Sequence, residues 1–203
     1  SSTARPPQAG RPPVVAWAQP RPDTYKRAAA MVASVMARVA QHVPGVVLRL
    51  YDRQGPGDQA ILAEFNIPGL VLEWHPPMPY AAYLTSFDDV AVSLAPLCPD
   101  TPFSRGKSFG KVLAALDRKV PVVGSDACEH GAFFQPDTGI ITNDVDLWVS
   151  SIIALLSDPA RRQGFAARAF RAFGEALTVQ AAALRADEVL SGVICDGAQR
   201  RSA

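Results

Sequence analysis

The chain alternates between short apolar runs and longer segments with one apolar face. Six runs of four to six residues are rich in Val, Ile and Leu, which is typical of strands buried on both faces of a sheet. The predicted strands are Val14–Ala18, Val46–Tyr51, Leu70–Trp74, Val90–Leu94, Val120–Val123 and Gly139–Thr142. Because helical segments separate them, we expect the strands to pair in parallel through crossover connections.

Helical periodicity fills the intervals. Apolar residues recur three or four positions apart in several segments, which predicts helices with one buried face. The four clearest faces are Ala28, Met31, Val32, Val35 and Val39; Phe109, Val112, Leu113 and Leu116; Trp148, Ile152, Leu155 and Leu156; and Ala166, Ala169, Phe170 and Phe173. Shorter helices are expected near Ile61–Phe65 and Pro79–Ser86, a last helix from Thr178 to Leu190, and a loop over Ala127–Asp137.

Polar residues that favour helix starts precede these faces. The expected caps are Asp23 or Thr24, Asn143 or Asp144, Asp158 before Pro159, and Thr178. Strands and helices in alternation predict an α/β fold, a Rossmann-like, doubly wound and largely parallel sheet with helices on both faces. We expect this domain to span residues 14–190, between a linker or domain edge over 1–13 and a flexible tail over 191–203.

The composition fits this fold and excludes several functions. Hydrophobic residues make up 48% of the 203 residues and charged residues 19%, as in a domain with a sizeable core. The net charge of +1 gives no reason to expect a nucleic acid or an anionic membrane as partner. The chain has neither an apolar run of about 18 residues, as a transmembrane helix needs, nor a signal peptide. The three cysteines lack metal-ligand spacing, so we expect thiols in the cytoplasm and no metal.

Absent motifs exclude further classes. The sequence contains no Gly-x-Gly-x-x-Gly fingerprint and no P-loop, which argues against a nicotinamide dehydrogenase and a nucleoside triphosphatase. It also has no Gly-x-Ser-x-Gly elbow, which argues against a hydrolase.

The candidate chemistry lies where the fourth predicted strand leads into the next helix. Arg105 and Lys107 flank the helix start, Lys111 follows one turn later, and no acid lies among them. Because a helix N-terminus is partly positive, cations there are unfavourable unless an anion binds. Gly106 and Ser108 would offer backbone N–H groups to a phosphate. The alternative is an ordinary capped helix whose basic side chains extend into water.

Two other places at strand ends have residues that could bind a ligand. His75 follows the third predicted strand, and the carboxyl ends of strands are where ligands bind in open α/β sheets. A structural role is the alternative for this histidine. Glu129 and His130 follow the fifth strand, and we expect them in a loop near the site.

Several short motifs occur in the order found in one enzyme family. They are Ala95-Pro96-Leu97, Lys107-Ser108, Lys111-Val112-Leu113, Val120-Pro121-Val122-Val123-Gly124-Ser125, Thr138-Gly139-Ile140-Ile141, Trp148, and the run from Leu155 to Arg162. With these motifs, the chain from about Val14 to Leu190 resembles the C-terminal half of retaining GT-B-fold glycosyltransferases of the sucrose-synthase-like group. In that family this half binds the nucleotide-sugar donor. The resemblance therefore implies a missing N-terminal, acceptor-binding domain in a longer protein.

The resemblance also implies roles for single residues. Lys107 and Lys111 would be catalytic, as cations that stabilise the leaving diphosphate. The donor-binding residues would be Arg105, Gly106, Ser108, Arg21 and His75. Arg21 and Lys26 lie just past the first strand, where many family members place a cation on the donor phosphate; ordinary surface charge is the alternative for both. The nucleotide sugar is a substrate, so no cofactor is expected, and these cations make a metal unnecessary.

Two positions depart from the family pattern. The family has two glutamates eight positions apart, one near the donor sugar and one on the ribose hydroxyls, and these places fall on Gly106 and Ala114 here. We therefore expect weak nucleotide binding and no sugar transfer by this chain alone. The predicted function is the donor-binding domain of a glycosyltransferase whose acceptor is a glycan, a lipid or another molecule. The alternatives are a non-catalytic scaffold or nucleotide sensor, and an α/β domain whose basic turn binds no anion.

Overall fold

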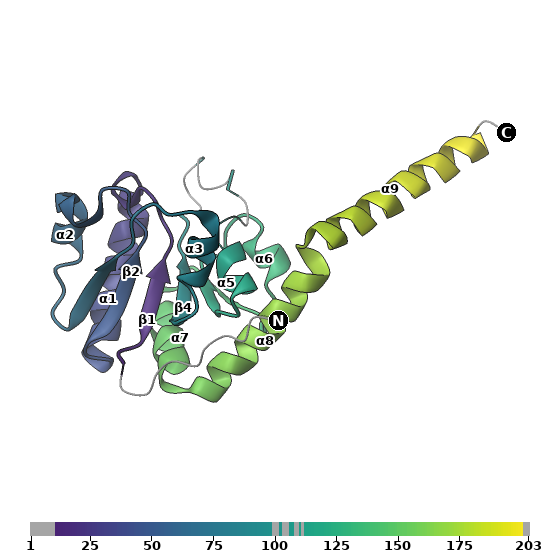
Figure 1. Cartoon of the computed structure of the whole chain (residues 1–203). Coiled ribbons are helices and arrows are strands. Elements are labelled where there is room, and N and C mark those ends of the chain that lie inside the picture. The colour runs from purple at the N-terminus through teal and green to yellow at the C-terminus, as the bar shows by residue number, and fades with distance from the viewer. Residues whose placement is uncertain (1–10, 99–101, 103–105, 108–109, 111, 201–203) are drawn as a thin grey trace.

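The computed structural model describes residues 11–98, 102, 106–107, 110 and 112–200, with the main chain alone for 192–200. A parallel sheet lies at its centre (Figure 1). Its strands are β1 Val14–Trp17, β2 Val46–Leu50, β3 Leu70–Trp74, β4 Val90–Ala95, β5 Val122–Gly124 and β6 Ile140–Ile141. They lie in the order β3-β2-β1-β4-β5-β6. The predicted fold class, a Rossmann-like parallel sheet, is confirmed.

Helices cover both faces of the sheet and give the domain three layers (Figure 1). The first face carries α1 Lys26–His42, α2 Gln59–Glu64 and α7 Val145–Ser157, and the second carries α3 Tyr80–Thr85, α5 Leu113–Asp117 and α8 Pro159–Ala176. Successive side chains of a strand point to opposite faces. Val15 and Trp17 of β1 therefore join the core under α1 and α7, whereas Val14 and Ala16 join the core under α5.

The strand order reverses between β1 and β4. β1 leads through α1 to β2 on one side, and β4 leads through α5 to β5 on the other. Because α1 and α5 lie on opposite faces, the chain leaves β1 and β4 toward opposite faces. In open α/β sheets, ligands bind at such a switch point, in the crevice outside the carboxyl ends of the strands. This edge of the sheet is the place for a ligand.

Three of the predicted helix caps are confirmed. Asp144, Asp158 and Thr178 accept hydrogen bonds from first-turn amides of α7, α8 and α9 Val179–Arg200. Each cap satisfies a backbone N–H group that has no partner within its own helix.

The predicted cap of α1 is wrong. Asp23 and Thr24 lie in a short 3-10 turn, and both side chains hydrogen-bond to Arg21 rather than to the helix. The N-cap position is taken by Tyr25, and among the described residues no side chain caps α1. The sequence pattern located this helix correctly but misplaced its start.

Two further expectations about helices are corrected. α5 begins at Leu113, later than the apolar face from Phe109 predicted, and Gly106 and Lys107 lie outside any helix, so Lys107 does not flank the start of α5. Ala127–Asp137, expected to be a loop, contains the short helix α6 His130–Phe133. A helix of one turn is too short to show a periodic pattern in the sequence.

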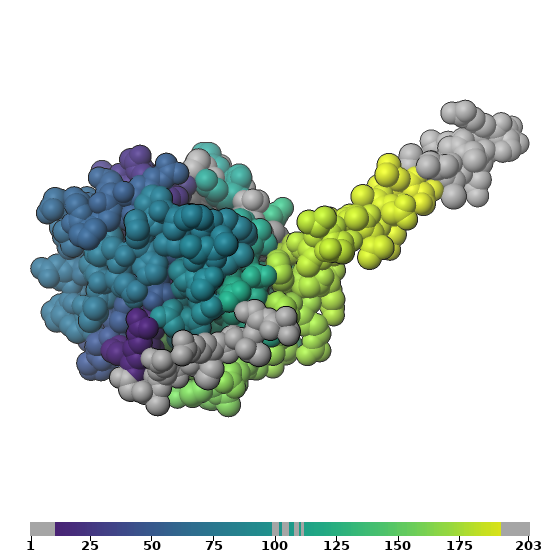
Figure 2. Space-filling view, in the orientation of Figure 1, coloured from purple at the N-terminus to yellow at the C-terminus, as the bar shows by residue number. Residues whose placement is uncertain are grey.

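α8 and α9 differ from the predictions at their surfaces. Phe170, expected in the buried face of α8, is 37% exposed, and the amine of Lys119 lies 4.7 Å from the centre of its ring. α9 continues to Arg200, beyond the predicted end at Leu190, and projects from the body of the domain (Figures 1 and 2). Among its described side chains, Val179, Leu184, Val189 and Leu190 are exposed, with Val179 at 82%.

Candidate functional site

The crevice edge is formed by the segments that follow β1, β4, β5 and β6. The segment after β1 is the one that ends at the start of α1. Arg21 donates two hydrogen bonds to Asp23, both at 3.0 Å, in an exposed ion pair. This pairing raises the pKa of Arg21 and lowers the pKa of Asp23. Arg21 thus lies just past β1, and its side chain already pairs with an acid.

The first turn of α1 is basic and uncapped. Lys26 and Arg27 are exposed there, and among the described residues no acid lies in this turn. A helix of this length concentrates positive potential at its N-terminus, where the first N–H groups lack helical partners. Two cations next to that potential are unfavourable by themselves and favourable when an anion binds.

The loop after β4 reaches the same point. The amine of Lys107 lies 5.9 Å from the centre of the Tyr25 ring, close enough for a cation–π contact. Tyr25 is the N-cap residue of α1, so Lys107 adds a third cation near this helix start. The sequence had placed the anion site at the start of α5, whereas the structure brings Lys107 to the start of α1.

Of the four other positions predicted around Lys107, three lie outside the described residues and one is a glycine. Arg105, Ser108 and Lys111 lie outside the described residues. Gly106 is in a turn directly before Lys107 and has no side chain with which to bind a ligand.

Ala114, where the family has its ribose-binding glutamate, points away from solvent. It is 2% exposed and packs in α5 against the apolar core under that helix. An acid at this position would have to leave that core to reach a ligand. Ala114 therefore differs from the glutamate of the family pattern in its packing as well as in its chemistry.

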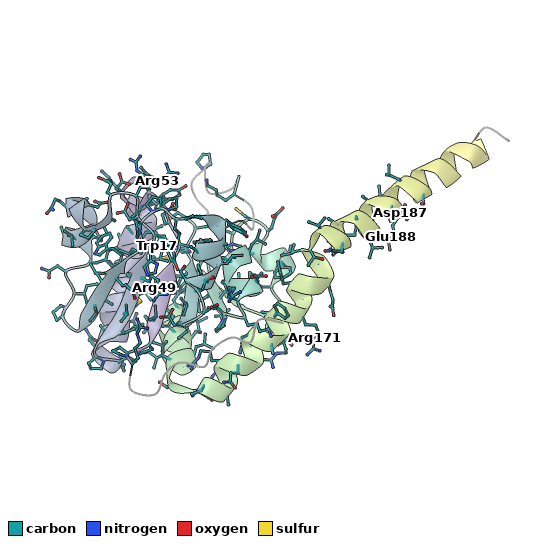
Figure 3. All side chains as sticks on the ribbon, in the orientation of Figure 1. Trp17, Arg49, Arg53, Arg171, Asp187 and Glu188 are labelled. Atoms are coloured by element: carbon teal, nitrogen blue, oxygen red, sulfur yellow. The ribbon has the colours of Figure 1, made fainter. Side chains whose placement is uncertain are left out.

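His75 lies at the end of β3, apart from the other candidates. β3 is an edge strand, and β2 separates it from β1. The imidazole Nε2 is 3.0 Å from a carboxylate oxygen of Glu73, and the ring lies 5.3 Å from that of Tyr51. Glu73 also accepts two hydrogen bonds from the buried Arg49 (Figure 3). The structure thus places His75 in a network of ion pairs that the sequence did not predict.

Two buried polar side chains, Gln19 and Asp52, lie where β1 and β2 end. Gln19 and Asp52 follow β1 and β2, and their Nε2 and Oδ2 atoms have no hydrogen-bond partner among the described residues. Burial raises the pKa of Asp52, the Gln54 amide opposes this by donating to it, and Asp58 raises it further. The Arg53 amide donates to the Pro20 carbonyl and ties the two turns together. Figure 3 shows Arg53 at this edge of the sheet.

The segment after β5 is tied to both neighbouring strands. The Leu97 amide, just past β4, donates to Ser125 Oγ at 2.9 Å. The buried imidazole of His130 donates from Nδ1 to the Ser125 carbonyl at 3.0 Å. On the β6 side, the side-chain amide of Asn143 bonds to the main chain of Asp126. His130 and Asn143 thus hold the segment after β5 by hydrogen bonds to its main chain. The sequence had indicated Asn143 only as a helix cap.

The described part of the chain contains neither a cluster of metal ligands nor a helix that could span a membrane. No group of three or more His, Cys, Asp and Glu side chains there could hold a metal ion. Within the same residues, no helix has both the length and the apolar character to cross a membrane.

Comparison by sequence finds no relative: no family model matches the chain, and no curated protein matches it. Comparison by structure finds many. The C-terminal domain of a glycosyl transferase group 1 family protein from Francisella tularensis has a TM-score of 0.59 at 12% identity, over 85% of this chain and 95% of that one. Sucrose-phosphate synthase from Thermosynechococcus elongatus has a TM-score of 0.67 at 14% identity, over 91% of this chain and 46% of that one. This chain has the fold of a glycosyltransferase C-terminal domain.

Proteins with this fold carry out more than one reaction. UDP-GlcNAc 2-epimerase from Neisseria meningitidis, solved with UDP-GlcNAc bound, matches with a TM-score of 0.54 at 13% identity, over 78% of this chain and 40% of that one. The chain spans less than half of the length of the synthase and of the epimerase. A shared fold does not select the reaction, because function depends on the residues of the site.

Proposed function

We propose that this chain is the donor-binding domain of a retaining GT-B glycosyltransferase and binds the diphosphate of a nucleotide sugar in the β1–β4 crevice. The observation that carries the proposal is the meeting of Lys107 with the uncapped, basic first turn of α1. Cations together with the N–H groups of a helix start are complementary to a diphosphate. The UDP-GlcNAc bound to the epimerase of similar fold supports a nucleotide sugar as the anion.

In the proposed reaction, the bond between the sugar carbon and the diphosphate oxygen breaks, and the sugar passes to an acceptor oxygen. Negative charge develops on the leaving nucleoside diphosphate. Lys107 and Lys111 would stabilise that charge, and Arg105, Gly106, Ser108 and Arg21 would bind the donor. An acceptor-binding domain elsewhere in a longer chain would close over the donor and exclude water.

A nucleotide sensor without transfer activity is the second candidate, and Gly106 and Ala114 favour it. Neither residue has a carboxylate, and the burial of Ala114 leaves no room for one at the crevice. Both candidates bind a nucleoside diphosphate and differ only in transfer. Binding is therefore the property to test first.

Calorimetric titration of the chain with UDP and with GDP tests the proposal. Replacing Lys26 and Lys107 together by Ala should weaken binding at least about tenfold, because charge-assisted contacts contribute roughly 1.5–3 kcal/mol each. Arg171→Ala removes one positive charge from the exposed surface of α8 (Figure 3) and should leave the affinity unchanged. If the double variant binds as tightly as the parent chain, the diphosphate does not bind at α1.

A further inference from the structure

The side chain of Asn143 acts as an additional strand partner beyond β6. Its Oδ1 accepts the Asp126 amide at 3.1 Å, and its Nδ2 donates to the Asp126 carbonyl, also at 3.1 Å. The regular pairing of β5 with β6 ends at Gly124 and Ile141, and the Thr142 amide then donates to the Gly124 carbonyl. The Asn143 amide therefore extends the β5–β6 hydrogen-bond ladder by one position.

The segment that Asn143 holds is a tight turn with an unusual residue in it. The His130 amide donates to the Ala127 carbonyl at 3.2 Å, which closes a four-residue turn. Cys128, at the second position, has φ 56°, and Glu129, at the third, has φ −84° and ψ −2°. A positive φ at the second position followed by such a third residue is the pattern of a type II′ turn, which favours Gly where Cys128 stands. This strained turn depends on the bonds at its ends.

The held turn borders the proposed donor site. Ser125 and Asp126 lead from β5 into it, and Ser125 Oγ accepts the Leu97 amide from the segment after β4. The same connection between β4 and α5 contains Lys107, whose amine lies near Tyr25 at the start of α1. A change in the position of Asp126 would therefore reach the β4 side of the crevice through Ser125.

We propose that Asn143 is a positioning residue of the nucleotide-sugar site. By holding both backbone groups of Asp126, it fixes the β5–α6 turn as the wall of the crevice next to β4. A side-chain amide suits this task, because it offers one acceptor and one donor to the amide and the carbonyl of one residue. The inference rests on the proposed function, since the site that Asn143 would shape is the proposed nucleotide site.

The test uses the whole 203-residue chain and compares Asn143→Ala, Asn143→Gln and the control Asn66→Ala. Asn66 is an exposed asparagine between α2 and β3, at the opposite end of the strands. Two quantities are measured for each variant: hydrogen exchange of the Asp126 amide by NMR, without ligand, and the Kd for UDP by calorimetry. The exchange rate reports whether the Asn143 side chain protects the Asp126 amide, and the Kd reports whether the nucleotide site depends on the hydrogen bonds between the two residues.

Asn143→Ala should raise the exchange rate of the Asp126 amide about tenfold and weaken UDP binding roughly fivefold to tenfold, as expected for the loss of one or two hydrogen bonds. Asn143→Gln keeps the amide on a longer side chain, so both quantities should lie between those of the parent and of Asn143→Ala. Asn66→Ala should match the parent in both. If Asn143→Ala does not fold, the comparison of Asn143→Gln with the parent still decides.

The possible failures are distinct. If the parent chain binds neither UDP nor GDP, the proposed function fails and this role for Asn143 fails with it. If the parent binds UDP and Asn143→Ala binds it equally well despite faster exchange at Asp126, the hydrogen bonds of Asn143 are only structural. The role of Asn143 at the nucleotide site is then overturned, and the proposed function stands. Unchanged exchange at Asp126 would also overturn this role of Asn143.

Discussion

Arg49 donates to both carboxylate oxygens of Asp89, at 2.6 and 3.0 Å, from inside the sheet. Its second terminal nitrogen also donates to both oxygens of Glu73 on β3, at 3.1 Å each. The side chain of Arg49 is only 3% exposed, whereas those of Glu73 and Asp89 are 31% and 36% exposed. One buried cation therefore links β2, β3 and the turn before β4 through two acids at the surface.

Removal of this cation should destabilise the domain. Arg49→Met keeps most of the buried volume but removes the one cation that Glu73 and Asp89 share, leaving them only His75 and Arg11, and we expect a loss of about 2–4 kcal/mol in the free energy of unfolding. The partial exposure of both acids moderates this loss. Urea denaturation measures it, with Arg21→Ala as control, because the Arg21–Asp23 pair is exposed and should contribute much less. A loss no larger than that of the control would contradict a structural role for Arg49.

The same network should make stability depend on pH in the acid range. Burial raises the pKa of Glu73 and of Asp89, but hydrogen bonds from Arg49, and at Glu73 also from His75, outweigh it and hold both pKa values below their usual range. An acid whose pKa is lower in the folded state stabilises it above the unfolded pKa and ceases to do so as the pH falls through the folded pKa. Unfolding free energies measured between about pH 6 and pH 2 should fall, with a smaller slope in Arg49→Met. Equal slopes would assign the acid sensitivity to other groups.

The turn after β5 offers a substitution that should stabilise. Cys128 has φ 56°, which costs a residue with a side chain roughly 1–2 kcal/mol and glycine almost nothing. Glycine also loses more chain entropy on folding, so Cys128→Gly should gain about 0.5–1 kcal/mol. Thermal unfolding measures this gain. Gly139→Ala is the opposite control, because its new methyl group would lie 2.3 Å from the Phe134 ring and should lower Tm.

The family's second glutamate should not be tolerated at position 114. Ala114 is buried against the apolar core under α5, so Ala114→Glu would bury a carboxylate, and we expect a loss of about 2–4 kcal/mol. Ala182→Glu, on the exposed surface of α9, should have little effect. Affinities for UDP and for its 2′-deoxy analogue complete the measurement. If Ala114→Glu is stable and prefers the ribonucleotide by about tenfold more than the parent does, position 114 can reach a ribose.

Much of the fold could be predicted from the sequence, because its strands are buried on both faces and read as uninterrupted apolar runs. β3 was predicted at its observed bounds, Leu70–Trp74. The helix α6 could not be predicted, since four residues do not complete a periodic pattern. The start of α1 was misplaced because Asp23 has two possible partners, the helix and Arg21, and the structure pairs it with Arg21.

The candidate site was predictable only in part. The sequence showed Lys107 among cations and placed it after a strand, but its contact with Tyr25 depends on β1 and β4 being neighbours. Arg49 stands in an apolar run, where a lone charge is unusual, yet its acids come from a neighbouring strand and from a turn forty residues away. The role of Asn143 depends in the same way on the register of β5 with β6.

The projecting helix α9 gives the molecule an elongated shape. Its 22 residues extend for about 33 Å at 1.5 Å per residue. A compact chain of this length would have a radius of gyration near 17 Å. Because much of α9 lies outside the body of the domain (Figure 2), small-angle scattering from the isolated chain should give a larger radius and a pair-distance distribution with a long tail. A partner that covers α9 would bury its exposed apolar side chains in an interface.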